Sequence, residues 1–206
     1  ILFESGATLV SANAVSSTPM SVTFADDVDV SGLCKDRMIG ILSGQGKRQY
    51  RVITSVSGQT VTISEPWTIQ PDETSYFVAG KFYRDIVVYK NMQMSFTNVT
   101  DGMNASCGIG GPCNTVNLTV SSNTYSYMNT PVGLYSIVEQ KNGQNLYDIL
   151  AWAKFDHNAA EKVKNGFGLR VFYYGSGDTV PKTGATMSGI LFRNNSVNDL
   201  VWSRDL

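Results

Sequence analysis

The sequence predicts an all-β protein in which a solenoid of stacked coils follows a β-rich N-terminal segment, and three observations carry this prediction. A motif of one apolar residue, two variable residues and Asn occurs four times, at spacings within the range of about 20–50 residues that is typical of repeat arrays. A second mark, Gly followed by an apolar residue, recurs at positions 102, 133 and 168. Turn-forming residues are abundant and only 16% of the residues are charged, which is typical of a turn-rich β protein.

The Asn residues of the repeated motif are expected to end strands and to form a turn ladder. They are Asn91, Asn123, Asn158 and Asn194. Asn tolerates the left-handed backbone conformation, and its side-chain amide can hydrogen-bond the Asn of the next coil. The segments Asp85–Tyr89 and Ser188–Phe192, beside the first and last of them, read as strands. The alternative is that Asn, a common residue in this chain, falls at these spacings by chance.

The bulk composition excludes several classes of protein. A chain of 206 residues with 42% hydrophobic residues can bury a substantial core, as one large domain or two small ones. The formal net charge of −1 argues against a nucleic-acid-binding protein, which normally carries a basic stripe or patch. No run approaches the roughly 18 consecutive apolar residues of a membrane span. Because the chain starts at Ile1 without Met and shows no capping unit near Leu206, it is expected to be a piece of a longer polypeptide.

The three cysteines of the chain indicate whether it folds in an oxidising compartment. Cys107 and Cys113 bracket a glycine-rich loop and are expected to close a small disulfide ring, with free thiols as the alternative. A metal site would need a second Cys or His pair at ligand spacing, and the sequence has none. Cys34 is expected to be a small buried hydrophobic residue.

Four sequons mark candidate glycosylation sites, and three of them lie around the cysteine loop. They are at Asn98, Asn104, Asn117 and Asn194. Together with the cysteine pair, they favour a secreted protein at the cell surface or outside the cell. A glycan at Asn194 would conflict with a place for that residue in the turn ladder.

The N-terminal part reads as short strands and turns. Residues 1–40 alternate apolar and polar side chains, and their acidic residues lack the regular spacing of a calcium loop. Residues 39–76 read as a β-meander with a tight turn at Ser57-Gly58. Pro66 and Pro71 end strand pairing because each lacks a backbone donor, and Trp67 is expected to cover the apolar face of the meander.

This meander carries the most recognisable pattern of the chain. It reads Gly44-x-Gly46-x-x-Gln49-Tyr50-Arg51, followed by Pro66-Trp67 and by Pro71-Asp72. It resembles the region that precedes the coils in right-handed parallel β-helix proteins of the pectate-lyase-like superfamily. The resemblance implies a right-handed parallel β-helix with an inserted β-meander, formed by an N-terminal segment, 1–80, and coils over 81–206 in one continuous domain. The same pattern recurs in bacterial surface proteins, phage tail proteins and glycan-active enzymes, so it indicates fold rather than activity.

The segment Asn145–Lys164 has two interpretations. Its Ala, Leu, Glu and Lys residues favour a helix. The alternation of Ile149, Ala151, Ala153 and Phe155 favours a strand, which is the expectation adopted here. In the next strand, Leu169, Val171 and Tyr173 are expected on one face, and residues 175–186 are expected to form a surface excursion between coils.

Catalytic residues are not recognisable in the sequence. His157, the one histidine, has no nucleophile motif to serve and is expected to be structural. A glycosidase needs two converging carboxylates, and no pair among the acidic residues is singled out by its spacing. A lyase needs calcium-binding carboxylates and a basic residue, for which Arg84, Asp85 and Arg170 are conceivable members. The sequence does not decide whether the protein is an enzyme and favours a non-catalytic protein. No cofactor or metal is expected.

Three functions remain, and the first is preferred. It is a non-catalytic structural segment of an extracellular fibre, filament or appendage, whose partners are other parts of its own chain or other copies. The alternatives are a polysaccharide lyase or glycoside hydrolase, and a glycan-binding adhesin or phage tail-spike module. The candidate glycan-stacking residues are Tyr83, Tyr125, Tyr127, Phe172 and Tyr174. Such aromatic residues more often pack a core than bind sugar.

Overall fold

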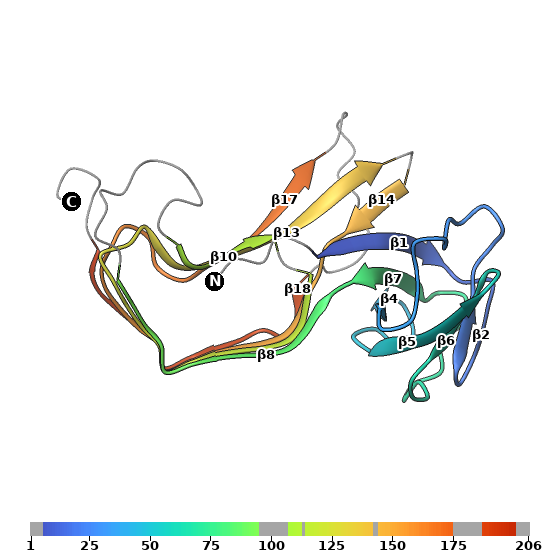
Figure 1. Ribbon diagram of the computed structural model, residues 1–206, viewed down its shortest axis with the longest axis horizontal. Coiled ribbons are helices and arrows are strands. Elements are labelled where there is room, and N and C mark those ends of the chain that lie inside the picture. Colours follow the sequence, from blue (N-terminus) through green and yellow to red (C-terminus); the bar gives the residue numbers. More distant parts are fainter. Residues whose placement is uncertain (1–5, 95–106, 113, 142–143, 175–186, 201–206) are drawn as a thin grey trace.

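A computed structural model describes residues 6–94, 107–112, 114–141, 144–174 and 187–200. Every regular secondary-structure element among these residues is a β-strand, so the all-β prediction is confirmed (Figure 1). No described segment is a helix of the length and hydropathy needed to cross a membrane. The strands divide into an antiparallel N-terminal sheet and a stack of parallel strands.

The N-terminal sheet contains seven antiparallel strands in the order β1-β7-β4-β5-β6-β3-β2. Their bounds are β1 Ala7–Asn13, β2 Ser16–Thr18, β3 Ser21–Thr23, β4 Met38–Ser43, β5 Tyr50–Ser57, β6 Thr60–Ile63 and β7 Tyr76–Lys81. β5 and β6 form the predicted hairpin, and Gly58 takes the left-handed conformation in its turn. The sheet encloses its own core, in which Trp67 and Phe24 pack against Phe77 with ring centroids 6.0 Å apart in both pairs. Trp67 therefore covers this core as the sequence predicts.

The Gly-x-Gly-x-x-Gln motif fixes the long loop between β6 and β7. A side chain on Gly44 would place its Cβ 2.0 Å from the carbonyl oxygen of Thr74, so only glycine fits there. The Gln49 amide oxygen accepts bonds from the backbone N–H groups of Thr68 (2.7 Å) and Ile69 (3.1 Å). Its Nε2 donates to the carbonyl oxygens of Gly46 (2.9 Å) and Ile69 (2.8 Å). The motif is a structural clamp that ties β4 and β5 to the loop.

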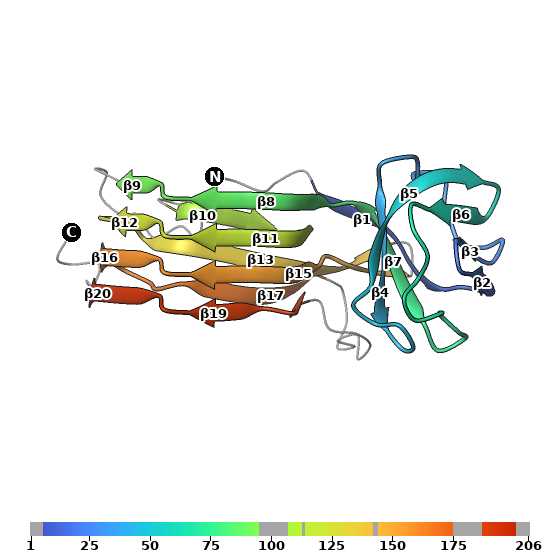
Figure 2. The ribbon, with the colours of Figure 1, turned by 90° about the horizontal axis from the view of Figure 1, so that it is seen from below.

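Apart from β14, the remaining strands pair in parallel in three sheets, the first, second and third coil sheets. A coil is the length of chain from a strand of one of these sheets to the next equivalent strand of the same sheet, and both β18 and β19 belong to the last described coil. The first coil sheet contains β8 Tyr83–Tyr89, β11 Thr115–Ser121, β15 Leu150–Asp156, β18 Met187–Ser188 and β19 Leu191–Arg193. The second contains β9 Met92–Met94, β12 Thr124–Ser126, β16 Ala159–Val163 and β20 Ser196–Leu200. The third contains β10 Cys107–Pro112, β13 Thr130–Lys141 and β17 Gly168–Tyr174, with β14 Gln144–Tyr147 paired antiparallel to β13. Figure 2 shows the strands of the first two coil sheets as rungs lying side by side.

The ladders keep a strict register. Val120 aligns with Val88 on one side and with Phe155 on the other, and Phe155 aligns with Phe192. Gly133 and Gly168, predicted as equivalent positions, are also aligned, whereas position 102 lies outside the described residues. Asn145–Lys164 forms β-strands, which confirms the strand interpretation over the helix. Residues 175–186, predicted as a surface excursion, lie outside the described residues.

Inward positions in the coils are filled by like residues stacked on one another. Leu118, Val120, Ala153 and Phe155 are all at most 1% exposed. The rings of Phe155 and Phe192 stack with centroids 4.4 Å apart and planes 12° from parallel. Because each interior side chain meets its equivalent in the next coil, burial comes from stacking rather than from long-range interdigitation.

Left-handed residues mark equivalent points of each coil. Within the first coil sheet, the aligned residues have φ between 55° and 65°. They are Asp85, Asn117, Trp152 and Gly189. A second column, Lys90, Ser122, His157 and Asn194, lies at the corner between the first and second coil sheets, and a third is Tyr127, Lys162 and Asp199. Each step from column to column is five residues, as in 117, 122 and 127. The alternating strand pattern is therefore interrupted at regular places where the chain bends.

The N-terminal sheet packs against the beginning of the coils. A shared core cluster joins Met38, Leu42 and Val78 of the sheet to Tyr147 and Ile149 of the coils. β7 also runs directly into β8, so the chain passes from the sheet to the first coil without a long linker (Figure 1).

One cysteine prediction is wrong. Cys34 is exposed, because it lies in a tight turn where the Arg37 N–H bonds to its carbonyl oxygen, and only its neighbour Leu33 enters the core.

Candidate functional site: the asparagine corner and the coil surface

A ladder of asparagine side chains runs through the corner between the first and second coil sheets. Nδ2 of Asn91 donates to Oδ1 of Asn123 at 3.1 Å, and Nδ2 of Asn123 donates to Oδ1 of Asn158 at 2.9 Å. Nδ2 of Asn158 donates to Oδ1 of Asn195 at 2.8 Å. The steps between these residues are 32, 35 and 37 positions. The ladder therefore links all four coils.

The interior asparagines use every hydrogen-bonding site of their amide groups. Oδ1 of Asn158 accepts from both the backbone N–H and the Nδ2 of Asn123, at 3.1 and 2.9 Å. Its Nδ2 also donates to the carbonyl oxygen of Val120 at 2.9 Å. Asn123 and Asn158 are each 1% exposed. A buried amide with two donated and two accepted bonds carries no desolvation penalty from an unmade bond.

The fourth predicted ladder residue is wrong by one position. Asn195, not Asn194, completes the ladder, because the alignment of Phe155 with Phe192 sets the register of the last coil. Asn194 instead has a φ of 53° and places its amide 3.3 Å from Nε2 of His157 at the surface. The left-handed conformation assigned to the ladder asparagines belongs to the residue before each of them.

A second pair of stacked asparagines, Asn129 and Asn165, is not among the residues predicted from the sequence. Nδ2 of Asn165 donates to Oδ1 of Asn129 and, at 3.3 Å, to Oγ1 of Thr130. The two asparagines lie 36 positions apart, so the coil repeat was the signal that could have found them.

An ion network surrounds Asp156 on the outer side of the same corner. Arg193 donates from Nε to Oδ1 at 3.0 Å and from a terminal nitrogen to Oδ2 at 2.9 Å. Lys154 Nζ lies 2.9 Å from Oδ2, and His157 Nδ1 lies 2.7 Å from Oδ1. The two bonds from Arg193, helped by Lys154, hold the pKa of Asp156 well below its usual range. A carboxylate kept ionised in this way cannot donate a proton as a general acid near neutral pH.

Only some of the predicted disulfide and glycosylation residues lie in the described part of the chain. Cys107 is half-buried, and burial raises the pKa of its thiol, while its predicted partner Cys113 lies outside the described residues. The described residues contain no disulfide, so the ring remains a prediction. Asn98 and Asn104 also lie outside the described residues. Asn117 is exposed on β11 and donates from Nδ2 to Asp85 at 2.8 Å. Glycosylation at any of these positions remains a prediction.

The predicted stacking residues do not form one surface. Tyr125 is fully buried, with its ring edge-on to Phe167, so its assignment as a glycan-stacking residue is wrong. It faces inward because it is aligned with Gln93 and Ala160 at an interior position. Tyr83 is partly buried against the coil core. Tyr127 is 37% exposed, and its hydroxyl is 2.8 Å from Lys162 Nζ. The side chains of Phe172 and Tyr174 lie outside the described part.

Among the described residues, no group of three or more His, Cys, Asp or Glu side chains could hold a metal ion. The acidic residues near the N-terminus include Asp29, which bonds Ser31 at 2.6 Å within its own turn.

Comparison with known proteins gives similarity to solved structures alone. No family model and no curated protein matches the chain. The tailspike protein gp49 of Pseudomonas phage LKA1 is 13% identical over 95% of this chain and 35% of that chain, with a TM-score of 0.33. The Gp54 tailspike of Acinetobacter baumannii bacteriophage AP22, solved in complex with a capsular saccharide, is 11% identical over 83% of this chain and 46% of that chain, with a TM-score of 0.29.

A third structure has a similar match. The tailspike gp61 of Pseudomonas phage phi297 is 14% identical over 93% of this chain and 51% of that chain, with a TM-score of 0.29. The chain thus spans about a third to a half of the length of these tailspikes.

Proposed function

We propose that residues 81–206 are coils of a right-handed parallel β-helix and that the protein is a non-catalytic structural segment of an extended surface protein, such as a fibre or appendage. In this proposal residues 1–80 form a β-rich N-terminal part of the same continuous domain. The protein acts outside the cell, where stacked coils provide stiffness.

The saturated asparagine ladder is the observation that carries this proposal. Each interior ladder residue bonds to the coil before it and to the coil after it, so the coils are held at a fixed offset. Strands stacked in register lie about 4.7–4.9 Å apart. Repeating the same contact from coil to coil makes stability a sum of neighbour interfaces, which suits a rod rather than a hinged enzyme.

The last described coil supports a stack that continues. Phe192 occupies an interior position, aligned with the buried Phe155, yet it is 42% exposed. Leu200 on β20 is likewise aligned with the buried Val163 and is 61% exposed. In repeat proteins a following coil or a partner covers such a face.

Amide hydrogen exchange tests the continuing stack. We expect β19 and β20 to exchange slowly in a longer polypeptide that carries the following natural sequence, and faster in the 206-residue chain. Equal exchange in both proteins would contradict a continuing stack.

A polysaccharide-cleavage assay tests the non-catalytic part of the proposal. Acidic and neutral polysaccharides are incubated with the protein, and reducing ends and unsaturated uronate are measured. No product above background is expected. Cleavage that disappears in Asp85→Asn would establish the lyase or hydrolase alternative instead.

A further inference from the structure

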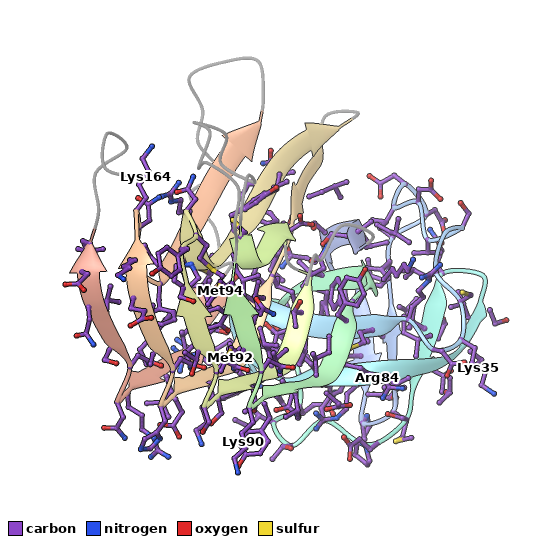
Figure 3. All side chains as sticks on the ribbon, turned by 60° about the vertical axis from the view of Figure 1, so that its left-hand side comes forward. Lys35, Arg84, Lys90, Met92, Met94 and Lys164 are labelled. Atoms are coloured by element: carbon purple, nitrogen blue, oxygen red, sulfur yellow. The ribbon has the colours of Figure 1, made fainter. Side chains whose placement is uncertain are left out.

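A groove of about 420 Å³ lies between the N-terminal sheet and the first coil sheet. Its size falls in the range of about 300–1,000 Å³ that small-molecule sites occupy. One wall contains Arg48, Tyr50 and Arg51 of the N-terminal sheet, and the other contains Arg84 and Trp152 of the coils. Figure 3 shows Arg84 where the first coil adjoins the N-terminal sheet.

Trp152 is an exposed aromatic side chain held in one orientation. Its Nε1 donates to the carbonyl oxygen of Arg48 at 3.2 Å, across the two walls of the groove. A Cβ on Gly189 would lie 2.5 Å from the indole ring, so the ring rests directly on that glycine. The residue is nevertheless 45% exposed. Because the ring is already immobilised, a ligand that stacks on it loses little further side-chain entropy.

Two guanidinium groups in the groove are available to a ligand. Arg84 is 46% exposed, and its one ion pair within the described structure, to Asp85, is at the 4.0 Å limit. Arg48 is exposed, and its charge lies near the Tyr50 side chain in the same wall of the groove. Arg51, in contrast, donates to the Pro66 carbonyl oxygen at 2.9 and 3.1 Å and serves the loop. Arg48 and Arg84 can therefore bind an added carboxylate, for which the guanidinium fork is well matched.

The groove also presents acceptors. The carboxylates of Glu65 and Asp85 and the Thr68 hydroxyl line it. Three arginines and two carboxylates leave a single formal positive charge in the groove. A polyanion with closely spaced charges would meet repulsion from the two carboxylates, whereas a ligand with many hydroxyls and one carboxylate per repeat would find donors and acceptors.

We infer that this groove binds a short acidic oligosaccharide. The apolar face of one pyranose ring stacks on Trp152, as sugar C–H groups do on aromatic rings. The carboxylate of a uronic acid lies between Arg48 and Arg84, and ring hydroxyls donate to Asp85 and Glu65. None of the stacking residues predicted from the sequence belongs to this site. The inference is independent of the structural role proposed above, since a rod segment and a ligand groove can coexist.

Isothermal titration of the intact 206-residue chain tests the site. The probes are tetrasaccharides that contain glucuronate or galacturonate, compared with neutral tetrasaccharides of the same length. Saturable binding is expected for at least one acidic probe, with at least tenfold weaker binding of the neutral ones. No saturable binding of any acidic probe at millimolar concentration, or equal affinity for neutral probes, would overturn the inference.

Matched variants assign the binding to the groove. Arg84→Ala is expected to weaken binding of the acidic probe about tenfold or more, because it removes a charge-assisted hydrogen bond to the carboxylate. Lys35→Ala, which removes an exposed cation of the N-terminal part outside the groove, is expected to leave affinity unchanged. Trp152→Phe should retain more affinity than Trp152→Ala, since it keeps an aromatic face. An Arg84→Ala effect no larger than that of Lys35→Ala would contradict the assignment.

Discussion

The N-terminal sheet and the coils are built from the same kind of secondary structure but are held together in different ways. In the N-terminal sheet, one side chain fixes one loop: the Gln49 amide makes four bonds, and each goes to a different backbone group. In the coils, the same bond is repeated between equivalent residues of neighbouring coils. A substitution in the N-terminal sheet should therefore have a local effect, whereas the effect of a substitution in the coils should depend on its position in the stack.

The largest effect is expected in the core of the coils, and it tests whether the coils unfold separately from the N-terminal sheet. Phe155→Ala removes a fully buried ring from the centre of the stack and should lower the free energy of unfolding by about 3–5 kcal/mol. Denaturant unfolding followed by circular dichroism measures the loss. Phe77→Ala in the N-terminal core is the matched control and should cost a similar amount. Amide exchange then separates the regions: if each variant loses protection in both regions equally, the shared cluster around Met38 and Ile149 makes them one unit and the contrast is lost.

The next prediction compares the loss of stability on substituting an interior ladder asparagine with the loss on substituting the terminal one. Asn158→Ala leaves buried partners in two coils without bonds and should cost about 2–4 kcal/mol. Asn91→Ala, at the exposed first coil, should cost about 1 kcal/mol or less. Thermal unfolding of the two variants measures the difference. Equal losses would show that the ladder bonds do not act through stacking.

A smaller effect is expected at the loop clamp. Gln49→Ala should cost about 1–2 kcal/mol, because its four bonds are partly exposed to water. Proteolysis should then cut the loop near Ile69. Gln45→Ala, whose side chain makes a bond to the carbonyl oxygen of Gln70, is the control and should have less effect. Increased cleavage in the coils instead of the loop would contradict a local role.

The smallest effect concerns pH. The pKa of Asp156 is lowered in the folded state, so its contribution to stability is present above the unfolded pKa of about 3.9 and is lost as pH falls below it. Asp156→Asn should flatten the dependence of the free energy of unfolding on pH below about 4. Between pH 6 and 8 the shape of that dependence should change little. Denaturant unfolding at a series of pH values measures this. A variant with the same acid dependence as the parent would show that the network does not contribute.

The sequence was most informative where residues repeat. Three ladder asparagines were found because each follows an apolar residue by three positions, and the fourth was misplaced because Leu191 and Phe192 are both apolar and either fits the motif. Only the pairing of Phe155 with Phe192 decides between them. Tyr125 was assigned outward because the change of face after each left-handed corner residue cannot be read from an alternating pattern.

The groove could not be predicted for a different reason. Arg48, Arg84 and Trp152 are far apart in sequence and belong to no common motif. The packing of the N-terminal sheet against the coils brings them together. The arginine of the recognisable motif, Arg51, proved to hold a loop instead.

The five-residue spacing of left-handed residues has a consequence for how such a chain can change in length. The positions 152, 157 and 162 repeat the intervals of 117, 122 and 127, yet 25 residues separate Tyr127 from Trp152 and 27 separate Lys162 from Gly189. The difference in length between coils thus lies in the part that returns from the third column of left-handed residues to the first, while the part between the three columns keeps a constant length. Foreign peptides grafted into the return part should be tolerated, while a single residue inserted between two corners would turn every following side chain to the wrong face.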